Sequence, residues 1–385
     1  MLWINFLHLY QPANSDAYRI EEATDLSYER IFKALDKNKD IKFTFNISGC
    51  LVLRLVELKR FDLINKINCL LERRQIELVG SAAYHPLLPL VDKKEIVRQI
   101  KENEAIIKKY FPKAKLSGFF LPEMAYGLEV AKIIKKLGYS WVILDEISYD
   151  LSTDKIDYSK IYKDKNSQLK IIFRSRNFSN CYVPDKILDF LARDKKNLNR
   201  VIVSATDGEL YGLRHRDPRK KFEKLLKKKE LKTILISDYV KNKKVINVSV
   251  KNSNWESSEA DLIKKEPYHL WYSKKNKIHL KLWELANLTY RIIEKHKRDA
   301  NYDWSIWHFV RGLASCTFWW ASDNDFKHNF GPRAWSPDEI ERGIVEFVRA
   351  VRSLENSTSR EEKMKAEMLL IKIKKMIWTK HWSRN

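Results

Sequence analysis

Short apolar runs alternate with amphipathic stretches from the N-terminus to about residue 250, and this alternation constrains the fold more than any other feature of the chain. Helical stretches such as "SYERIFKALDKNK" and "KKEIVRQIKENEAIIKKYF" lie between most of the runs. Strands that alternate with helices form a parallel sheet that the helices cover. Seven or eight strands favour closure into a barrel, and a doubly wound sheet is the alternative. The runs comprise residues 2–9, 42–48, 76–81, 115–120, 141–146, 170–175, 200–206 and 245–250.

The pattern changes after about residue 277, where the strand-like runs stop. The rest of the chain repeats its apolar positions with a helical period in residues 279–297, 304–321, 336–354 and 359–378. We therefore expect an α/β fold in two parts. Residues 1–265 should form a barrel, and residues 277–385 should form a helical bundle that packs against the barrel.

The composition is that of a globular protein, with 44% hydrophobic and 12% aromatic residues. No apolar run approaches the roughly 20 residues that span a bilayer. The start, "MLWINFLHLYQP", lacks a basic segment and a small-residue cleavage site, so we expect no signal peptide and a cytoplasmic protein. The four cysteines form no CxxC pair, which argues against a zinc ribbon or a disulfide framework.

The formal net charge of +23 suggests nucleic acid as one possible ligand. The lysines are nevertheless dispersed over many helical stretches, as in "RKKFEKLLKKKELK" (219–232), where they alternate with Glu and Leu. Such stretches are usually solvated helix faces. We therefore expect no nucleic acid partner and no membrane contact, although a basic patch away from the strand ends would favour nucleic acid.

Polar side chains gather where four of the predicted strands end. Because the carboxyl ends of parallel strands converge on one face of a barrel, these residues should meet in one active site. They are His8, Tyr10 and Gln11 after the first strand, Ser81, Tyr84 and His85 after the third, Glu123 after the fourth, and Asp207 and Glu209 after the strand at 200–206.

Separate carboxylates surrounded by aromatic rings suit the cleavage of glycosidic bonds. One carboxylate attacks the anomeric carbon, and the other protonates the leaving oxygen and later activates water. Sugar rings stack on apolar aromatic faces. Trp255 and the cluster of Phe318, Trp319 and Trp320 are the best-placed candidates for stacking.

Five segments in order resemble the five motifs of glycoside hydrolase family 57. They are "HLYQP", "GSAAYHPLLPL", "GFFLPEMAYG", "ATDGELYG" and "ASCTFWWAS", and the resemblance covers about residues 1–325. It implies an incomplete (β/α)7 barrel with a C-terminal α-helical domain that completes the active site. It also implies a retaining mechanism without metal or other cofactor. The family is associated with α-amylases, amylopullulanases, 4-α-glucanotransferases, branching enzymes and some α-galactosidases.

The resemblance assigns a role to each motif residue. Glu123 corresponds to the nucleophile, Asp207 to the general acid/base and Glu209 to an acid that positions the substrate. The motifs imply that His8 and Gln11 bind the sugar. Together with the candidates from the strand ends and the aromatic residues, the expected substrate-binding residues are His8, Tyr10, Gln11, Tyr84, His85, Glu209, Trp255, Trp319 and Trp320. The substrate should be an α-glucan or an oligosaccharide.

Three departures from the motifs leave the substrate open. Tyr10 stands where a second His is usual, and His85 stands where some members have an acid. Cys316 and Thr317 occupy the place where an acid often precedes the aromatic run of the fifth motif. Neither predicted catalytic carboxylate is missing. The sequence does not show which glycosidic linkage is cleaved, whether the reaction is hydrolysis or transfer, or what the oligomeric state is.

Other functions stay open beside the α-amylase-like or 4-α-glucanotransferase-like one. An α-galactosidase of the same family is one alternative. A metal-dependent polysaccharide deacetylase has a similar barrel, but it needs an early Asp-Asp pair and an HxxxH spacing that the chain lacks. A non-catalytic glucan-binding barrel is the third, and the altered fifth motif keeps it open.

Overall fold

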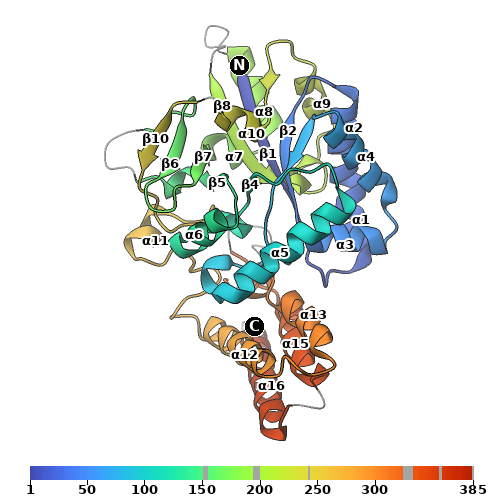
Figure 1. Ribbon diagram of the computed structural model, residues 1–385, viewed down its shortest axis with the longest axis vertical. Coiled ribbons are helices and arrows are strands. Elements are labelled where there is room, and N and C mark those ends of the chain that lie inside the picture. The colour runs from blue at the N-terminus through green and yellow to red at the C-terminus, as the bar shows by residue number, and fades with distance from the viewer. Residues whose placement is uncertain (151–154, 194–199, 242, 324–332, 355–357, 384–385) are drawn as a thin grey trace. The chain divides into compact units, whose positions relative to one another are not determined.

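The computed structural model describes residues 1–150, 155–193, 200–241, 243–323, 333–354 and 358–383 of the chain (Figure 1). The chain divides into two compact units. The first comprises Met1–Gln11, Ser15–Ala83 and Leu88–Trp255, and the second comprises Pro12–Asn14, Tyr84–Leu87 and Glu256–Asn385. Two short segments of the N-terminal half, 12–14 and 84–87, thus belong to the second unit.

The strands of the first unit lie in two hydrogen-bonded sheets. One sheet has the order β3-β2-β1-β8, with β9 beside β1, and the other has the order β10-β6-β7-β5-β4. The strands are β1 (Leu2–Leu9), β2 (Phe43–Ile47), β3 (Ile76–Leu78), β4 (Gly118–Phe119), β5 (Trp141–Asp145), β6 (Ile161–Asp164), β7 (Lys170–Arg174), β8 (Val201–Asp207), β9 (Lys232–Thr233) and β10 (Val245–Val248).

Backbone contacts at two junctions join these sheets into a ring. A parallel bridge links Gly80, just after β3, to Phe119 of β4, and the Gly80 N–H donates to the Gly118 carbonyl at 2.9 Å. Between β7 and β8, the Ser175 N–H donates to the Val203 carbonyl at 2.9 Å. The ring therefore has the seven parallel strands β1, β2, β3, β4, β5, β7 and β8. The predicted seven-stranded α/β barrel is confirmed, and the doubly wound alternative is wrong.

Large aromatic side chains pack against the junction of β3 and β4 and leave room only for glycine. A Cβ atom on Gly80 would lie 2.3 Å from the hydroxyl of Tyr139, and one on Gly118 would lie 2.1 Å from the ring of Trp141. Both rings are buried. The two strands thus approach each other where two glycines face two rings.

The strand predicted at residues 245–250 exists as β10 but lies outside the ring. It pairs with β6, and β6 runs antiparallel to β7. The sequence did not predict β6 or the two-residue β9, because neither has an apolar run long enough to stand out.

Helices cover the ring and close its core. Apolar side chains of α5 and α6 pack on the outer face of β4, β5 and β7, and Figure 1 shows both helices beside these strands. The helices of this unit are α1 (Ala17–Ala23), α2 (Glu29–Lys37), α3 (Gly49–Glu57), α4 (Phe61–Glu72), α5 (Lys93–Tyr110), α6 (Leu128–Lys136), α7 (Arg176–Ser179), α8 (Val183–Arg193), α9 (Lys221–Leu226) and α10 (Ile236–Lys241).

The side chains that point into the barrel are apolar in the middle of the strands and polar at their carboxyl ends. Side chains of β1, β5, β7 and β8 meet in one buried cluster that includes Ile4, Phe6, Ile143, Ile172, Val203 and Ala205. Because successive inward positions are two residues apart, the next ones toward the carboxyl ends are polar. They are His8, Asp145, Arg174 and Asp207.

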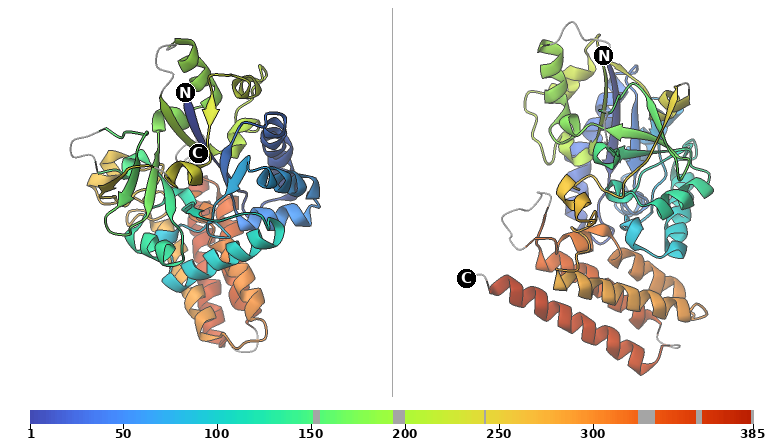
Figure 2. Two further views of the ribbon diagram at one scale, coloured as in Figure 1. Left: turned by 45° about the horizontal axis from the view of Figure 1, so that its top comes forward. Right: turned by 90° about the vertical axis from the view of Figure 1, so that its left-hand side faces the viewer.

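The second unit is helical. It contains α11 (Glu259–Ile263), α12 (Lys277–Lys295), α13 (Tyr302–Gly312), α14 (Ser315–Trp319), α15 (Pro337–Ser353) and α16 (Arg360–Trp382). Helix α15 contacts α12, α13 and α16, so that the long helices form a bundle, coloured orange to red in Figure 2. Side-chain caps fix the starts of three of them, because Asn276 caps α12, Ser336 caps α15 and Ser359 forms a capping box with Glu362 on α16.

The helix expected at residues 304–321 is interrupted after Gly312. Ala314 is extended, with ψ at 137°. The Ser315 N–H donates to the His85 carbonyl at 3.0 Å instead of to the preceding turn. A contact distant in sequence thus overrides the helical period. Within the described ranges, no helix combines the length and apolar character that a membrane span needs.

Candidate functional site

His8 occupies the first inward polar position of β1, between two polar neighbours. The strand register pairs it with Asn46 of β2 on one side and with Asp207 of β8 on the other. Its Nδ1–H donates to Asn46 Oδ1 at 2.8 Å, and its ring stacks on Phe120 with centroids 4.5 Å apart. Burial lowers the pKa of His8 to about 4, so the ring is neutral at neutral pH.

Asp207 ends β8 and pairs with an arginine from the following loop. Arg214 NH1 lies 2.7 Å from Asp207 Oδ2. The backbone N–H of Arg214 also donates to the backbone carbonyl of Glu209 at 2.8 Å, which folds the loop back over the strand end. Burial opposes the charge of the guanidinium, but Asp207 and Glu209 outweigh it and raise the pKa of Arg214. The ion pair therefore orients the Asp207 carboxylate.

Glu209 is buried in the short turn that follows β8. Its Oε1 accepts hydrogen bonds from the hydroxyl of Tyr28 and, at 3.0 Å, from Gln11 Nε2. Burial raises the pKa of Glu209 to about 7, and the charge of Asp207 adds to this effect while Arg214 opposes it. Glu209 therefore titrates nearer to neutral pH than an ordinary glutamate, and part of its population is protonated there.

Glu123 follows β4 in a strained turn. Its backbone is left-handed, with φ at 59° and ψ at 17°, and that of Met124 is left-handed too, with φ at 49°. Such geometry is uncommon for residues other than glycine and is held by the surrounding structure. Here the holding partner is Trp255, whose Nε1–H donates to Glu123 Oε2 at 3.0 Å and whose backbone N–H donates to the Glu123 carbonyl at 3.2 Å.

Two arginines hold Trp255 in turn. Arg174 and Arg176 donate to the Trp255 carbonyl at 3.3 and 3.0 Å, and the Arg174 guanidinium lies 5.3 Å from the indole ring. Asp145, which is fully buried, accepts from both arginines at 2.6 and 2.5 Å. Asp145 and the two arginines therefore fix the position of the indole that contacts Glu123.

The two predicted catalytic carboxylates belong to one connected set of side chains. Asp207 is the register neighbour of His8, the His8 ring lies 6.3 Å from that of Trp255, and Trp255 binds Glu123. Tyr10 stacks on His8 with centroids 5.8 Å apart. The structure thus brings the seven predicted residues of the first unit together at the carboxyl end of the barrel. They are His8, Tyr10, Gln11, Glu123, Asp207, Glu209 and Trp255.

Four predicted substrate-binding residues belong to the second unit. Tyr84 and His85 are buried there, and His85, with φ at 58°, forms a 3.0 Å hydrogen bond between its Nδ1 and Ser315 Oγ. Trp319 and Trp320 are partly exposed, with ring centroids 4.8 Å apart. Their role in binding a sugar stays a prediction.

Several members of the site were not predicted from the sequence. Asn46, Asp145 and Arg174 lie on strands that the sequence does predict, and extending the two-residue alternation to the strand ends would have found them. Arg214 lies seven residues after Asp207 in "TDGELYGLR", where a cation close to two acids is a weak signal. Tyr28 comes from a helical turn outside the strands, and nothing in its local sequence marks it.

In the ranges that the structure describes, no group of three or more His, Cys, Asp or Glu side chains could hold a metal ion. The four cysteines form no disulfide there.

Sequence comparisons match the first unit. The sequence profile of glycosyl hydrolase family 57 matches residues 4–251. An α-amylase of Pyrococcus abyssi is 27% identical over 221 residues, which are 54% of this chain and 33% of the amylase. A 4-alpha-glucanotransferase of Thermococcus kodakarensis is 25% identical over 55% of this chain and 34% of its own length. The chain thus spans about a third of the length of these relatives.

Structural comparison extends over the whole chain. A GH57-type branching enzyme of Pyrococcus horikoshii superposes with a TM-score of 0.71 at 15% identity. The superposition covers 99% of this chain and 96% of the branching enzyme. At this identity the likeness shows the fold.

Proposed function

The chain belongs to glycosyl hydrolase family 57, and on this premise we propose that it is an enzyme that cleaves or transfers α-glucan chains with retention of configuration. The observation that carries the proposal is the link from Asp207 through His8 and Trp255 to Glu123. Two carboxylates at the same end of a barrel, one bound by an indole N–H and one by an arginine, supply the pair of groups that a retaining glycosidase needs.

In the first step Glu123 attacks the anomeric carbon. The glycosidic bond breaks, Asp207 gives its proton to the leaving oxygen, and a covalent bond forms between the sugar and a Glu123 oxygen. In the second step Asp207 takes a proton from water or from a sugar hydroxyl, which attacks the same carbon and releases Glu123. Water gives hydrolysis, and a sugar acceptor gives transfer.

The neighbouring residues have positioning roles in this proposal. The Trp255 N–H binds Oε2 of Glu123 and so orients the carboxylate for the attack. Arg214 holds Oδ2 of Asp207. Neutral His8 and partly protonated Glu209 add little charge to the site at neutral pH, which suits a neutral sugar.

The names of the relatives support α-glucan as the substrate class. The sequence relatives are an α-amylase and a 4-alpha-glucanotransferase, and the superposed structure is that of a branching enzyme. The His8, Tyr10 and Trp255 rings lie at the same strand ends and offer faces for glucose units.

Incubation with maltooligosaccharides, followed by chromatography of the products, tests the proposal. We expect shorter products for a hydrolase or a ladder of both longer and shorter ones for a transferase. Glu123→Gln should reduce turnover roughly a thousandfold or more, because the amide is not a nucleophile. Exhaustive chelation should leave the activity unchanged. Zinc-dependent release of acetate from an acetylated polysaccharide would instead support the deacetylase.

Asp207→Asn provides a matched second variant. It should strongly reduce turnover of maltooligosaccharides. It should slow the first step with an aryl α-glucoside much less, because the leaving group of that substrate needs no proton. Azide should restore the second step and yield an α-glycosyl azide, since azide attacks without general base help. Normal activity of Glu123→Gln, or a β-configured azide product, would contradict the proposed mechanism.

A further inference from the structure

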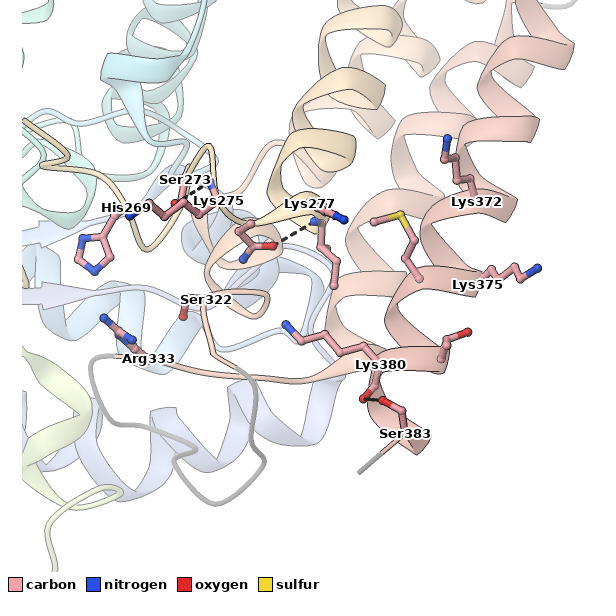
Figure 3. A pocket seen from close by; sticks show the side chains of 14 residues that line it. His269, Ser273, Lys275, Lys277, Ser322, Arg333, Lys372, Lys375, Lys380 and Ser383 are labelled. Carbon is pink, nitrogen blue, oxygen red and sulfur yellow. Dashed lines mark hydrogen bonds between the residues drawn. The ribbon is translucent and has the colours of Figure 1, made fainter. Parts of the chain in front are cut away.

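A basic cavity in the second unit has no part in the proposed mechanism. It has a volume of about 840 Å³ and lies between the start of α12 and the C-terminal half of α16 (Figure 3). None of the predicted site residues lines it. Among the residues that the structure describes, six lysine or arginine side chains line it and no aspartate or glutamate does: Lys275, Lys277, Arg333, Lys372, Lys375 and Lys380.

Three of the six cations that line the cavity have no acidic partner among the described residues. On α16, Lys365 and Lys374 each pair with a glutamate, at 2.6 and 2.5 Å. In the described part of the chain, Lys372 and Lys375 of the same helix, and Lys277 of α12, make no ion pair. Lysines without counter-charges make the electrostatic potential of the cavity positive, and this favours a bound anion.

Neutral polar groups complete the lining. Ser273, Ser322 and Thr379 also line the cavity, and the Ser322 hydroxyl already accepts the Ala334 N–H at 2.9 Å. Asn276 Oδ1 already accepts the backbone N–H groups of Ile278 and His279 at 3.0 and 3.2 Å, so the end of α12 is capped by the protein itself. The positive charge of the cavity therefore comes from side chains, and the hydroxyls can bind uncharged polar parts of a ligand.

One cation of the cavity is held in place. Lys380 Nζ lies 4.5 Å from the centre of the Trp335 ring and 3.5 Å from the Asp323 carbonyl. In Figure 3 its side chain extends from α16 toward Ser322 and the start of α12. Because the ring and the carbonyl already hold this ammonium group in place, it loses less conformational freedom when an anion binds.

We propose that this cavity binds a small phosphorylated sugar, in which a phosphate monoester is carried by a polyol. The lysines and Arg333 match a phosphate dianion through charge-assisted hydrogen bonds, and the serine and threonine hydroxyls match the sugar. The volume lies within the roughly 300–1,000 Å³ of small-molecule sites. A nucleic acid would instead need cations spread along an extended track. The proposal is independent of the glucan activity assigned to the barrel.

Calorimetric titration of the full chain with glucose 6-phosphate tests this assignment, with glucose and inorganic phosphate as parallel probes. We expect glucose 6-phosphate to bind more tightly than inorganic phosphate, and glucose not to bind. The affinity should fall roughly fivefold or more between about 50 mM and 500 mM NaCl, because salt screens exposed charges. The double variant Lys277→Gln/Lys375→Gln should bind about tenfold more weakly or worse.

The control is the double variant Lys281→Gln/Lys365→Gln, which removes two paired lysines from the same two helices. It should bind the probe as the parent does, and circular dichroism should confirm that both variants fold. The proposal is overturned if glucose 6-phosphate does not bind, if inorganic phosphate binds equally well, or if both double variants lose affinity alike. Tighter binding of a single-stranded oligonucleotide, lost in the first variant alone, would assign the cavity to nucleic acid instead.

Discussion

Glu209 and His8 are two buried residues whose pKa values move in opposite directions. Burial raises the pKa of Glu209 from 4.5 to about 7 and lowers that of His8 from 6.5 to about 4. Folding therefore favours the neutral form of each. Glu209 makes the fold less stable as the pH rises from 4.5 through 7, because the folded protein binds its proton more tightly than the unfolded chain. His8 makes it less stable as the pH falls from 6.5 through 4.

The variant Glu209→Gln separates these two effects. The variant lacks the carboxyl group, so its stability should not decrease through this group as the pH rises. The free energy of unfolding of the parent minus that of the variant should therefore fall by roughly 3 kcal/mol between about pH 4.5 and 7.5. Urea unfolding at several pH values measures this difference. A difference that stays constant over this range would mean that the carboxyl group titrates normally in the folded protein.

The candidate site shows how far single residues can be predicted. The motifs predicted Glu123, Asp207, His8 and Glu209, and the structure brings their side chains into one connected set. Trp255 and Gln11, which bind Glu123 and Glu209, were predicted, but other residues that orient the site were not. Asp145, for example, acts on Trp255 through arginines at and just after the end of β7, and such a contact exists only once the barrel has closed.

At the scale of secondary-structure elements, the long periodic segments were predicted and the irregular ones were not. β1 and α16 match the runs that predicted them, because burial on one or both faces imposes a regular pattern. The break between α13 and α14 is different, since it results from the contact of Ser315 with His85. No local pattern records a contact between residues that are 230 positions apart.

The junction of β3 and β4 gives a prediction at this scale. Gly118→Ala should destabilise the fold by about 1–3 kcal/mol, because the added Cβ would lie 2.1 Å from the Trp141 ring. Gly138→Ala is the comparison, since its Cβ would meet nothing within 4 Å although φ is 97°. That change should cost only about 1 kcal/mol, from backbone strain. Thermal unfolding of both variants checks the order, and a larger loss for Gly138→Ala would contradict the packing argument.

At the scale of the whole molecule, the net charge of +23 has a definite consequence for kinetics. A neutral oligosaccharide gains nothing from a positive field, so kcat/KM for maltooligosaccharides should change by less than about twofold between about 50 mM and 500 mM NaCl. An anionic ligand should respond strongly over the same range. A steep loss of kcat/KM with salt would show that the physiological substrate carries negative charge.

The left-handed backbone of Glu123 has a consequence for making synthetic catalysts from this protein under the proposed mechanism, in which Glu123 is the nucleophile. A retaining glycosidase whose nucleophile is replaced by a small residue can join an activated sugar fluoride to an acceptor without hydrolysing the product. At φ of 59° alanine keeps the strain of a Cβ atom, whereas glycine is released from it. Glu123→Gly should therefore be more stable than Glu123→Ala by about 1 kcal/mol, the reverse of the usual order of these residues, and comparison of their melting temperatures would show it.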